Sequence, residues 1–357
     1  MPPVAPRLRS EVAELVSGRL IGPDGAVERL RDPAEATASD IIVILSERQL
    51  PLGLASPAGL VILPDSWGAE QEGTPERAFI GVGDVHAAWE VLLTAFAPRL
   101  TIPTGLDARA IVHETALIGE GVHIGAGAVV ASGASIGRGT VVQSGAFIGE
   151  DVRLGDDCLV RVNATILHGA VIGNRCIIHP GVVIGSDGFG YRVKQEGGYA
   201  KLPHIGGVVL EDDVEVGANS VIDRGTVRDV IIGCGTKIGP VCIVAHNARV
   251  GERVAMIGAV QMGGSVTIED DAVLMGQVGL AGHLTIGRGA TVTAQSGVTK
   301  SLAAGGTYRG LPARPIKQAM RIEARVADLE ATARRVRELE QRLKELESRL
   351  AAVEAVE

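Results

Sequence analysis

Aromatic residues are scarce in this chain of 357 residues: Phe, Trp and Tyr make up only 3% of it, although hydrophobic residues make up 46%. A core with so few rings has to be built from aliphatic side chains. Glycine is abundant instead, with 48 residues, about twice its usual share. Many glycines and few aromatic residues favour a fold with many tight turns between short apolar segments.

Paired cysteines, long apolar runs and an excess of basic residues are also missing. The four cysteines show no CxxC spacing, and we expect neither a secretory leader nor a transmembrane segment. A cytoplasmic location is therefore expected. The net charge of −8 argues against nucleic-acid binding, because phosphates require a basic surface. The histidines do not recur at the eighteen-residue spacing that a metal site between neighbouring coils would need, so we expect no metal.

An aliphatic residue recurs at every sixth position over most of the chain. One run extends from Val112 to Ile184 and a second from Ile232 to Val298. Four residues after each aliphatic position, most repeats carry a small or β-branched residue such as Ala128 or Ala134, and both positions are expected to point inward. Three such hexapeptides make one coil of about eighteen residues, which is the sequence signature of a parallel β-helix.

The repeat divides the chain into three parts. Residues 1–100 lack it and indicate a small α/β domain, residues 101–307 form the β-helix, and residues 308–357 form a helical extension. Apolar residues of the last part keep a 4-3 spacing, so we expect one long helix that packs in an oligomer. The predicted fold class is mainly β. In the N-terminal domain, strands are expected at 41–45, 60–63 and 78–82, and helices at 11–16 and 85–96.

The step of six fails in two places, which are candidate functional sites because regular coils need no exceptions. The first is a loop over residues 185–205 that contains Asp187, Phe189 and Tyr191. The second is an interruption of about four residues around 224–230. A plain surface excursion is the alternative interpretation of both.

Two histidines are predicted to share one face of the β-helix. His246 stands two places after the inward Val244 and should point outward. His283 follows 37 residues later, close to two coils, which places it at roughly 10 Å from His246. A substrate would fit between them. Position alone does not select His246, because His168 holds the same place in its hexapeptide.

Several segments resemble the UDP-3-O-acylglucosamine N-acyltransferase family of lipid A synthesis, in the same order and at similar intervals. They read IGSDGFGY, KLPHIG, VIDRG, VAHNARVG, MGGSVTI and AGHLTIG. The likeness covers nearly the whole chain. It implies a left-handed winding of the β-helix and a homotrimer, neither of which follows from the period of six.

The resemblance also implies a direct acyl transfer from the phosphopantetheine thioester of acyl carrier protein to the 2-amine of a nucleotide-linked glucosamine, without a cofactor. His246 would be the general base. A backbone N–H at Gly264 would stabilise the oxyanion. Residues implied to contact substrate or pantetheine are His283, Asp187, Phe189 and Tyr191.

The sequence departs from the family in the N-terminal domain, which corresponds to the uridine-binding domain. The family usually holds uracil with Phe, Asn and Tyr, and the matching residues here are Val43, Ser46 and Gln49. Aromatic stacking on the base is therefore lost. Near the last coils, Gly297 would leave space for an acyl tail.

A basic segment between Lys300 and Arg325 contains six positive residues and one acid, Glu323. We expect Arg314, Lys317 and Arg321 to dock the acidic acyl carrier protein; an ordinary charged helix start is the alternative. Two other functions stay open at this point. One is a hexapeptide sugar N-acetyltransferase that uses acetyl-CoA, and the other is a trimeric solenoid scaffold without catalysis.

Overall fold

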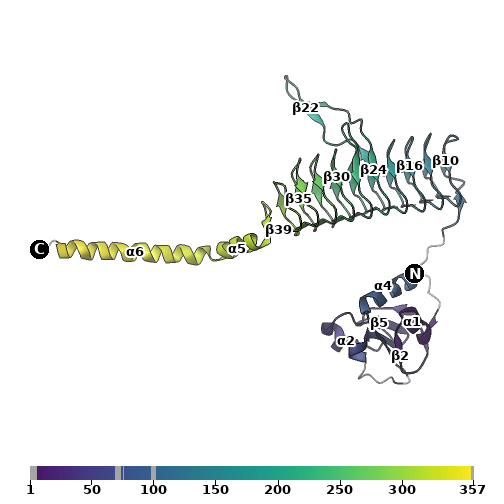
Figure 1. Cartoon of the computed structure of the whole chain (residues 1–357), viewed down its shortest axis with the longest axis horizontal. Coiled ribbons are helices and arrows are strands. Elements are labelled where there is room, and N and C mark those ends of the chain that lie inside the picture. The colour runs from purple at the N-terminus through teal and green to yellow at the C-terminus, as the bar shows by residue number, and fades with distance from the viewer. Residues whose placement is uncertain (1–5, 69–73, 75, 98–101, 355–357) are drawn as a thin grey trace. The chain divides into compact units, whose positions relative to one another are not determined.

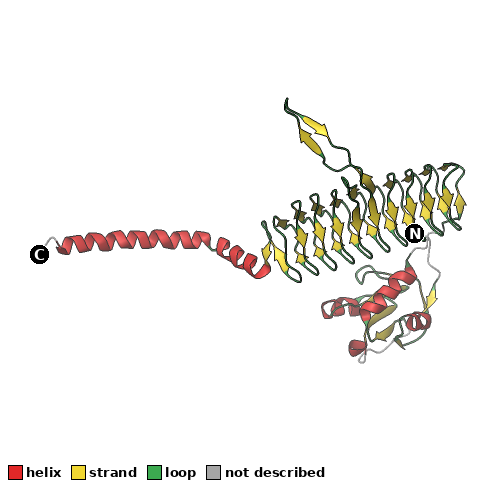
Figure 2. Ribbon diagram, turned by 45° about the horizontal axis from the view of Figure 1, so that its top comes forward, coloured by secondary structure: helices red, strands yellow, loops and turns green. Residues whose placement is uncertain are grey.

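The computed structural model describes residues 6–68, 74, 76–97 and 102–354 (Figure 1). The chain divides into two compact units, Met1–Thr101 and Ile102–Glu357. The fold class is the predicted one: a mainly β, left-handed parallel β-helix, with a small α/β unit before it and helices at its C-terminal end (Figure 2).

The first unit is a five-stranded sheet with the strand order β2-β7-β6-β5-β4. Because successive strand residues face opposite sides, Ile41 packs with Val12 and Leu92 on one face, and Ile42 packs with Leu50 and Trp67 on the other. The strands are β2 (Arg19–Ile21), β4 (Arg29–Leu30), β5 (Asp40–Val43), β6 (Leu60–Pro64) and β7 (Ala78–Val82). The helices are α1 (Arg9–Leu15), α2 (Leu50–Ala55), α3 (Asp65–Gly68) and α4 (Val85–Phe96). All five predicted elements are present.

The second unit winds through three parallel sheets, of ten, nine and twelve strands in the described chain. The ten-stranded sheet contains β9 (Ile111–Val112), β12 (Val129–Val130), β15 (Phe147–Ile148), β18 (Thr165–Ile166), β21 (Val183–Ser186), β26 (Val221–Asp223), β29 (Ile243–Val244), β32 (Gln261–Met262), β35 (Gly279–Leu280) and β38 (Gly297–Val298). The nine-stranded sheet contains β10 (Leu117–Ile118), β13 (Ser135–Ile136), β16 (Arg153–Leu154), β19 (Val171–Ile172), β24 (Val208–Leu210), β27 (Val230–Ile232), β30 (Arg249–Val250), β33 (Thr267–Ile268) and β36 (Thr285–Ile286). The twelve-stranded sheet contains β8 (Gly105–Leu106), β11 (His123–Ile124), β14 (Val141–Val142), β17 (Leu159–Val160), β20 (Ile177–Ile178), β25 (Glu215–Val216), β28 (Lys237–Ile238), β31 (Ala255–Met256), β34 (Val273–Leu274), β37 (Thr291–Val292), β39 (Thr307–Arg309) and, antiparallel to β39, β40 (Arg314–Pro315).

The predicted inward positions form one continuous aliphatic core. Ile124, Ile148 and Ile166 are fully buried, and so are the small residues Ala128 and Ala146 four places after an aliphatic residue. Val112 and Ile118 are only partly buried because they lie in the first coil, at the end of the stack. Each aliphatic residue thus packs against its counterpart in the next coil, which buries apolar surface along the whole solenoid.

The register of the paired strands gives the length of each of the two interruptions. Neighbouring coils pair residues eighteen positions apart, as in Val129 with Phe147. Across the first interruption the offset between Val171 and Val209 is 38, which leaves twenty extra residues. Across the second, the offset between Val221 and Ile243 is 22, which leaves four. Part of the longer insertion forms a hairpin of β22 (Tyr191–Val193) and β23 (Tyr199–Lys201), which projects from the solenoid in Figures 1 and 2.

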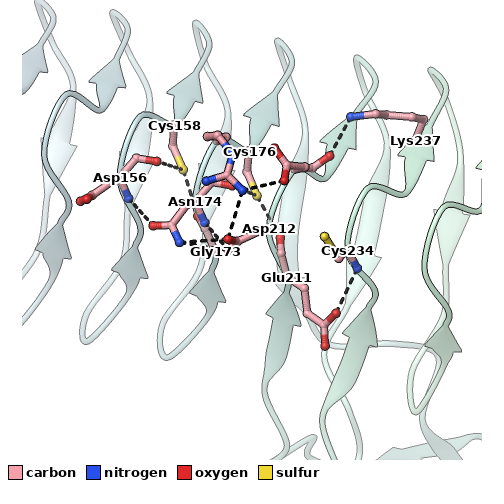
Figure 3. A network of polar contacts seen from close by, with 11 residues as sticks. Asp156, Cys158, Gly173, Asn174, Cys176, Glu211, Asp212, Cys234 and Lys237 are labelled. Carbon is pink, nitrogen blue, oxygen red and sulfur yellow. Dashed lines mark hydrogen bonds and ion pairs between the residues drawn. The ribbon is translucent and has the colours of Figure 1, made fainter.

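One corner of the solenoid, between the nine- and twelve-stranded sheets, carries a polar ladder (Figure 3). The side chain of Asn174 accepts from the Asp156 backbone N–H at 2.9 Å, and Asp212 accepts from the Asn174 N–H at 2.8 Å. Arg175 pairs with Asp213 at 2.6 Å. The thiols of Cys158 and Cys176 point inward beside this ladder. These contacts hold successive turns in register, and Cys158, Cys176 and Cys242 are buried packing residues.

The C-terminal extension consists of two helices rather than the single one expected. Helix α5 spans Ile316–Ala327 and α6 spans Leu329–Glu354, with Asp328 between them at φ −88° and ψ 2°. Aspartate is a poor residue inside a helix because its side chain competes for backbone groups. The apolar residues Leu339, Leu343 and Leu346 are exposed along α6.

Candidate functional site

The corner between the ten- and nine-stranded sheets, which we call the site corner, contains both interruptions and His246. The long insertion leaves this corner between β21 and β24, the short one leaves it between β26 and β27, and His246 lies on it between β29 and β30. At the other two corners, the spacing of six residues between successive strands is unbroken. The two interruptions, which the sequence offered as candidate sites, thus lie on the same corner as His246.

The ring of His246 is half-buried and is held from several sides. Its Nδ1 atom lies 3.1 Å from Asn247 Nδ2 and 3.4 Å from Thr226 Oγ1. The ring also lies against Gly264, where an added Cβ would be 2.5 Å from both Cε1 and Nε2 and 3.1 Å from Nδ1. The imidazole projects from the wall as predicted, and only glycine fits at position 264.

Gly264 offers a free backbone donor beside the ring. In the neighbouring residues, Gly263 N–H donates to Leu280 O at 2.9 Å and Ser265 N–H donates to His246 O at 2.9 Å. Within the described part of the chain, Gly264 N–H has no hydrogen-bond acceptor. Of the two glycines in this segment, Gly264 is therefore the one whose N–H is available to another group.

His283 stands on the same corner, in the second coil beyond His246. It is exposed, has a φ of +62°, and donates its backbone N–H to Gly264 O at 3.0 Å. Its charge is felt by His246, since it contributes to lowering the pKa of that ring. The structure thus brings His246 and His283 onto one corner, as the spacing predicts, and Gly264, which the resemblance implied, lies between them.

Two titratable side chains near His246 did not emerge from the sequence pattern. His204 is 6% exposed and meets His246 edge-on, with 5.4 Å between ring centroids. Asp223 accepts a hydrogen bond from Ser186 Oγ at 3.1 Å. His204 comes from the long insertion, where the period of six gives no register, and Asp223 ends β26 just before the short interruption. The only sequence signal was their presence in the KLPHIG and VIDRG segments.

The electrostatics of the site favour a neutral His246. Burial lowers the pKa of His246 below its ordinary value, His204 and His283 lower it further, and Asp223 opposes them. Burial also raises the pKa of Asp223. A buried ring without a strong acidic partner is easier to keep uncharged, so the imidazole has a lone pair available near neutral pH.

The long insertion reaches His246 through its backbone rather than its predicted side chains. An added Cβ at Gly188 would be 3.0 Å from His246 Cδ2. Asp187 instead pairs with Lys201 at 2.7 Å, which lowers the pKa of Asp187. Phe189 is 82% exposed and packs on Tyr191, with ring centroids 5.0 Å apart. The structure places these three residues on the insertion but not against the imidazole.

The insertion is anchored by a buried arginine. Arg224 donates from Nε to Gly206 O at 2.8 Å and from its backbone N–H to Ser186 O at 2.7 Å. Its guanidinium also contacts the His168 ring. Arg224 therefore ties both ends of the insertion to a regular coil, and His168, the equivalent of His246 in its hexapeptide, has a structural partner.

The three positions matched to a uracil grip do not form one in the first unit. Val43 is 5% exposed and lies in the core of the sheet. Gln49 Oε1 accepts from the Leu45 backbone N–H at 3.0 Å, and Ser46 is exposed. The expectation for Val43 is wrong, because a side chain buried on the inner side of β5 cannot contact a ligand.

The last coils differ from the sequence expectation at Gly297. A Cβ at Gly297 would overlap the Leu311 side chain, so Leu311 occupies the space that was expected for an acyl tail. In the basic segment, Arg309 pairs with Glu323 at 2.9 Å. Arg314, Lys317 and Arg321 form no ion pair with any described residue, and Lys317 and Arg321 lie one turn apart on α5.

The described residues hold neither a metal cluster nor a membrane-spanning helix. They contain no cluster of three or more His, Cys, Asp or Glu side chains that could ligate a metal. Within the same part of the chain, every helix is too short or too polar to cross a bilayer.

Known proteins match the repeat region. Residues 115–150 and 151–186 match the bacterial transferase hexapeptide family (six repeats). A UDP-3-O-acylglucosamine N-acyltransferase of Methylorubrum extorquens is 44% identical over 137 residues, which are 38% of this chain and 39% of that protein. A protein of the same name from Coxiella burnetii is 37% identical over 175 residues, or 49% of this chain and 51% of that protein.

A solved structure shares the fold. The Arabidopsis UDP-N-acetylglucosamine acyltransferase covers 59% of this chain and 73% of its own, with a TM-score of 0.50 and 19% identity. The chain spans between 39% and 51% of the length of the curated relatives above. Residues 115–150 and 151–186 thus match the hexapeptide family, and the two curated relatives support the resemblance found in the motifs over 38% and 49% of this chain rather than over nearly the whole chain.

Proposed function

We propose that this relative of the UDP-3-O-acylglucosamine N-acyltransferases transfers a hydroxyacyl group from acyl carrier protein to the 2-amine of a UDP-3-O-acylglucosamine in lipid A synthesis. The observation that carries the proposal is the pairing of the His246 imidazole with the free N–H of Gly264 on the site corner. One is a base and the other an oxyanion donor, the two groups that acyl transfer to an amine requires.

The reaction proceeds by direct transfer. Nε2 of neutral His246 takes a proton from the amine as its nitrogen attacks the thioester carbonyl. The Gly264 N–H donates to the oxygen that becomes negative. When the C–S bond breaks, the imidazolium returns its proton to the leaving thiolate, which restores the neutral ring and releases a thiol and an amide. His283 would hold substrate or pantetheine beside the base.

The lowered pKa of His246 predicts the pH dependence of the rate. A base works only when neutral, so activity should be constant at neutral pH and fall as the pH drops through the pKa of the ring. Because that pKa is lowered, we expect the midpoint of the fall below about 6.5, the ordinary value for histidine. The measurement is kcat/KM for the acyl thioester at saturating amine, and a midpoint above 6.5 would contradict the assignment.

The donor is tested by giving the purified protein acyl carrier protein thioesters and acyl-CoA in parallel, with the same amine acceptor. Preference for the carrier protein would support the proposal. Preference for short acyl-CoA would instead indicate a sugar N-acetyltransferase. Omitting the uridine part of the acceptor tests the nucleotide, since the first unit shows no aromatic residue at the positions matched to uracil binding.

Charge reversal in the basic segment should weaken carrier-protein docking. With Arg314, Lys317 and Arg321 changed to glutamate, we expect KM for the carrier thioester to rise by roughly tenfold with little change in kcat. Lys317 and Arg321 are exposed and Arg314 is half-buried, and these side chains would steer encounter rather than chemistry. The effect should shrink at high salt. A triple change at Arg334, Arg335 and Arg337 is the matched control, and an unchanged KM would remove the docking role.

We also propose that the protein acts as a homotrimer, as the resemblance implies. The exposed apolar residues Leu339, Leu343 and Leu346 of α6 keep the 4-3 spacing of a coiled-coil seam. Helices from other copies would cover them.

A further inference from the structure

The side-chain amide of Asn247 has a defined orientation. Its Oδ1 accepts the backbone N–H of Thr226 at 2.8 Å, and only the oxygen of the amide can do so. Its Nδ2 therefore faces the other way, 3.1 Å from His246 Nδ1 and 3.3 Å from Thr226 Oγ1. Each of the two amide hydrogens then has an acceptor, one on the ring and one on the hydroxyl.

This orientation determines the tautomer of the imidazole. An N–H donor directed at Nδ1 requires a lone pair there, so the proton of the neutral ring is on Nε2. Nε2 and Cε1 are the ring atoms nearest to Gly264, beside which the reacting groups would lie. In the arrangement observed, that nitrogen can donate a hydrogen bond but cannot take a proton.

Resting on the proposed role of His246 as the base, we propose that Thr226 and Asn247 are positioning residues that hold the ring in an inactive tautomer until the Asn247 amide turns over. After the turn, Nε2 gives its proton to solvent and Nδ1 takes one from solvent, so that Nδ1–H donates a hydrogen bond to Oδ1 and the lone pair is on Nε2. The Thr226 N–H loses its acceptor in that state. Each of the two tautomers is therefore stabilised by its own hydrogen bond between the Asn247 amide and Nδ1 of His246.

The short interruption of the solenoid places Thr226 where it can control the tautomer of His246. Its four extra residues bring Thr226 from β26–β27 onto Asn247 of the next coil, and Arg228 adds a hydrogen bond to Asn247 O at 3.2 Å. Because Thr226 lies outside the strand lattice, its contact can open without disturbing the paired coils. The other charged groups facing His246 are His204, Asp223 and His283, and none of them contacts Nδ1 at hydrogen-bond distance.

The decisive variant is Asn247→Asp. A carboxylate can accept from Thr226 N–H and from Nδ1–H at once, which fixes the active tautomer, and aspartate tolerates the φ of +59° at this position. We expect Asn247→Asp to keep at least wild-type kcat and to move the acidic limb of the rate upward by about one pH unit, because the carboxylate stabilises the imidazolium. Asn247→Ala, which only removes the support, should lose roughly 10–100-fold.

A readout without activity separates this inference from the proposed function. In protein labelled with nitrogen-15 histidine, the His246 signals are identified by their absence in His246→Ala. Wild type should carry its proton on Nε2, and Asn247→Asp should carry it on Nδ1. The inference would be overturned if the His246 ring of the wild-type protein carried its proton on Nδ1. It would also be overturned if Asn247→Asp changed neither the tautomer nor the acidic limb of the pH–rate profile. Activity retained by His246→Ala would overturn the base role itself, whichever tautomer is found.

Discussion

Replacing His246 with alanine should lower the rate of acyl transfer by roughly 10²–10⁴-fold, because proton removal from the attacking amine would be left to water. The loss should appear in kcat, measured with saturating thioester and amine. The ring is half-buried at a corner rather than in the aliphatic core, so the melting temperature should change little.

His113→Ala is the control for this substitution. His113 is another corner histidine, whose Nδ1 contacts Thr115 Oγ1 at 2.9 Å, far from the interruptions. It should keep full activity. A trimeric scaffold without catalysis would show no turnover in wild type, and that result would sink the enzyme assignment. Equal activity in the two variants would remove His246 as the base.

Gly264→Ala should be nearly as damaging as loss of the base itself. The new Cβ would stand 2.5 Å from His246 Cε1 and Nε2, so the ring has to leave its position. A misplacement of about 1 Å in reacting groups costs on the order of 10²-fold in rate. We expect a fall in kcat of about that size, with unchanged strand pairing by circular dichroism.

Gly276→Ala is the matched control, since its nearest foreign atom to an added Cβ is Gly258 O at 3.5 Å, an ordinary contact. This variant should behave like wild type. Full activity in Gly264→Ala would mean that the His246 ring is not needed where the structure places it. The control also reports any general cost of losing a corner glycine.

The fold was predictable from sequence because each coil repeats one simple physical problem. An aliphatic residue and a small residue must face inward every six positions, and residues such as Ile124, Ala128 and Ile148 do so. The same period placed His246 and His283 on one corner. Regular structure can be extrapolated, since strand pairing continues at an offset of eighteen residues.

The surroundings of His246 were not predictable in the same way. His204, Asp223 and Thr226 lie in or beside the interruptions, where the offset changes to 38 and then to 22. Their positions depend on how an insertion folds back, and no period describes that. Asn247 was next to His246 in the sequence, but its role appears only with the Thr226 N–H in place.

Errors arose where a local pattern ignored tertiary packing. Val43 was matched to a ligand position by alignment of motifs, yet β5 buries it in the sheet core. Gly297 suggested open space, but Leu311 from a later turn fills it. The 4-3 spacing predicted one helix, and Asp328 divides it into two. A glycine in the sequence therefore does not show whether the space beside it is open or filled by a residue from another part of the chain.

Both insertions of the solenoid leave it at the site corner. The residues around His246 can therefore change while the paired strands that stabilise the solenoid stay the same. Val171 and Val209 pair as neighbours although 38 positions separate them. The pairing of the coils is therefore the same whatever the length of the hairpin between them. Variation in that hairpin can change what reaches His246 while the coils beneath keep their contacts. The architecture can thus acquire new specificities without having to be stabilised again each time.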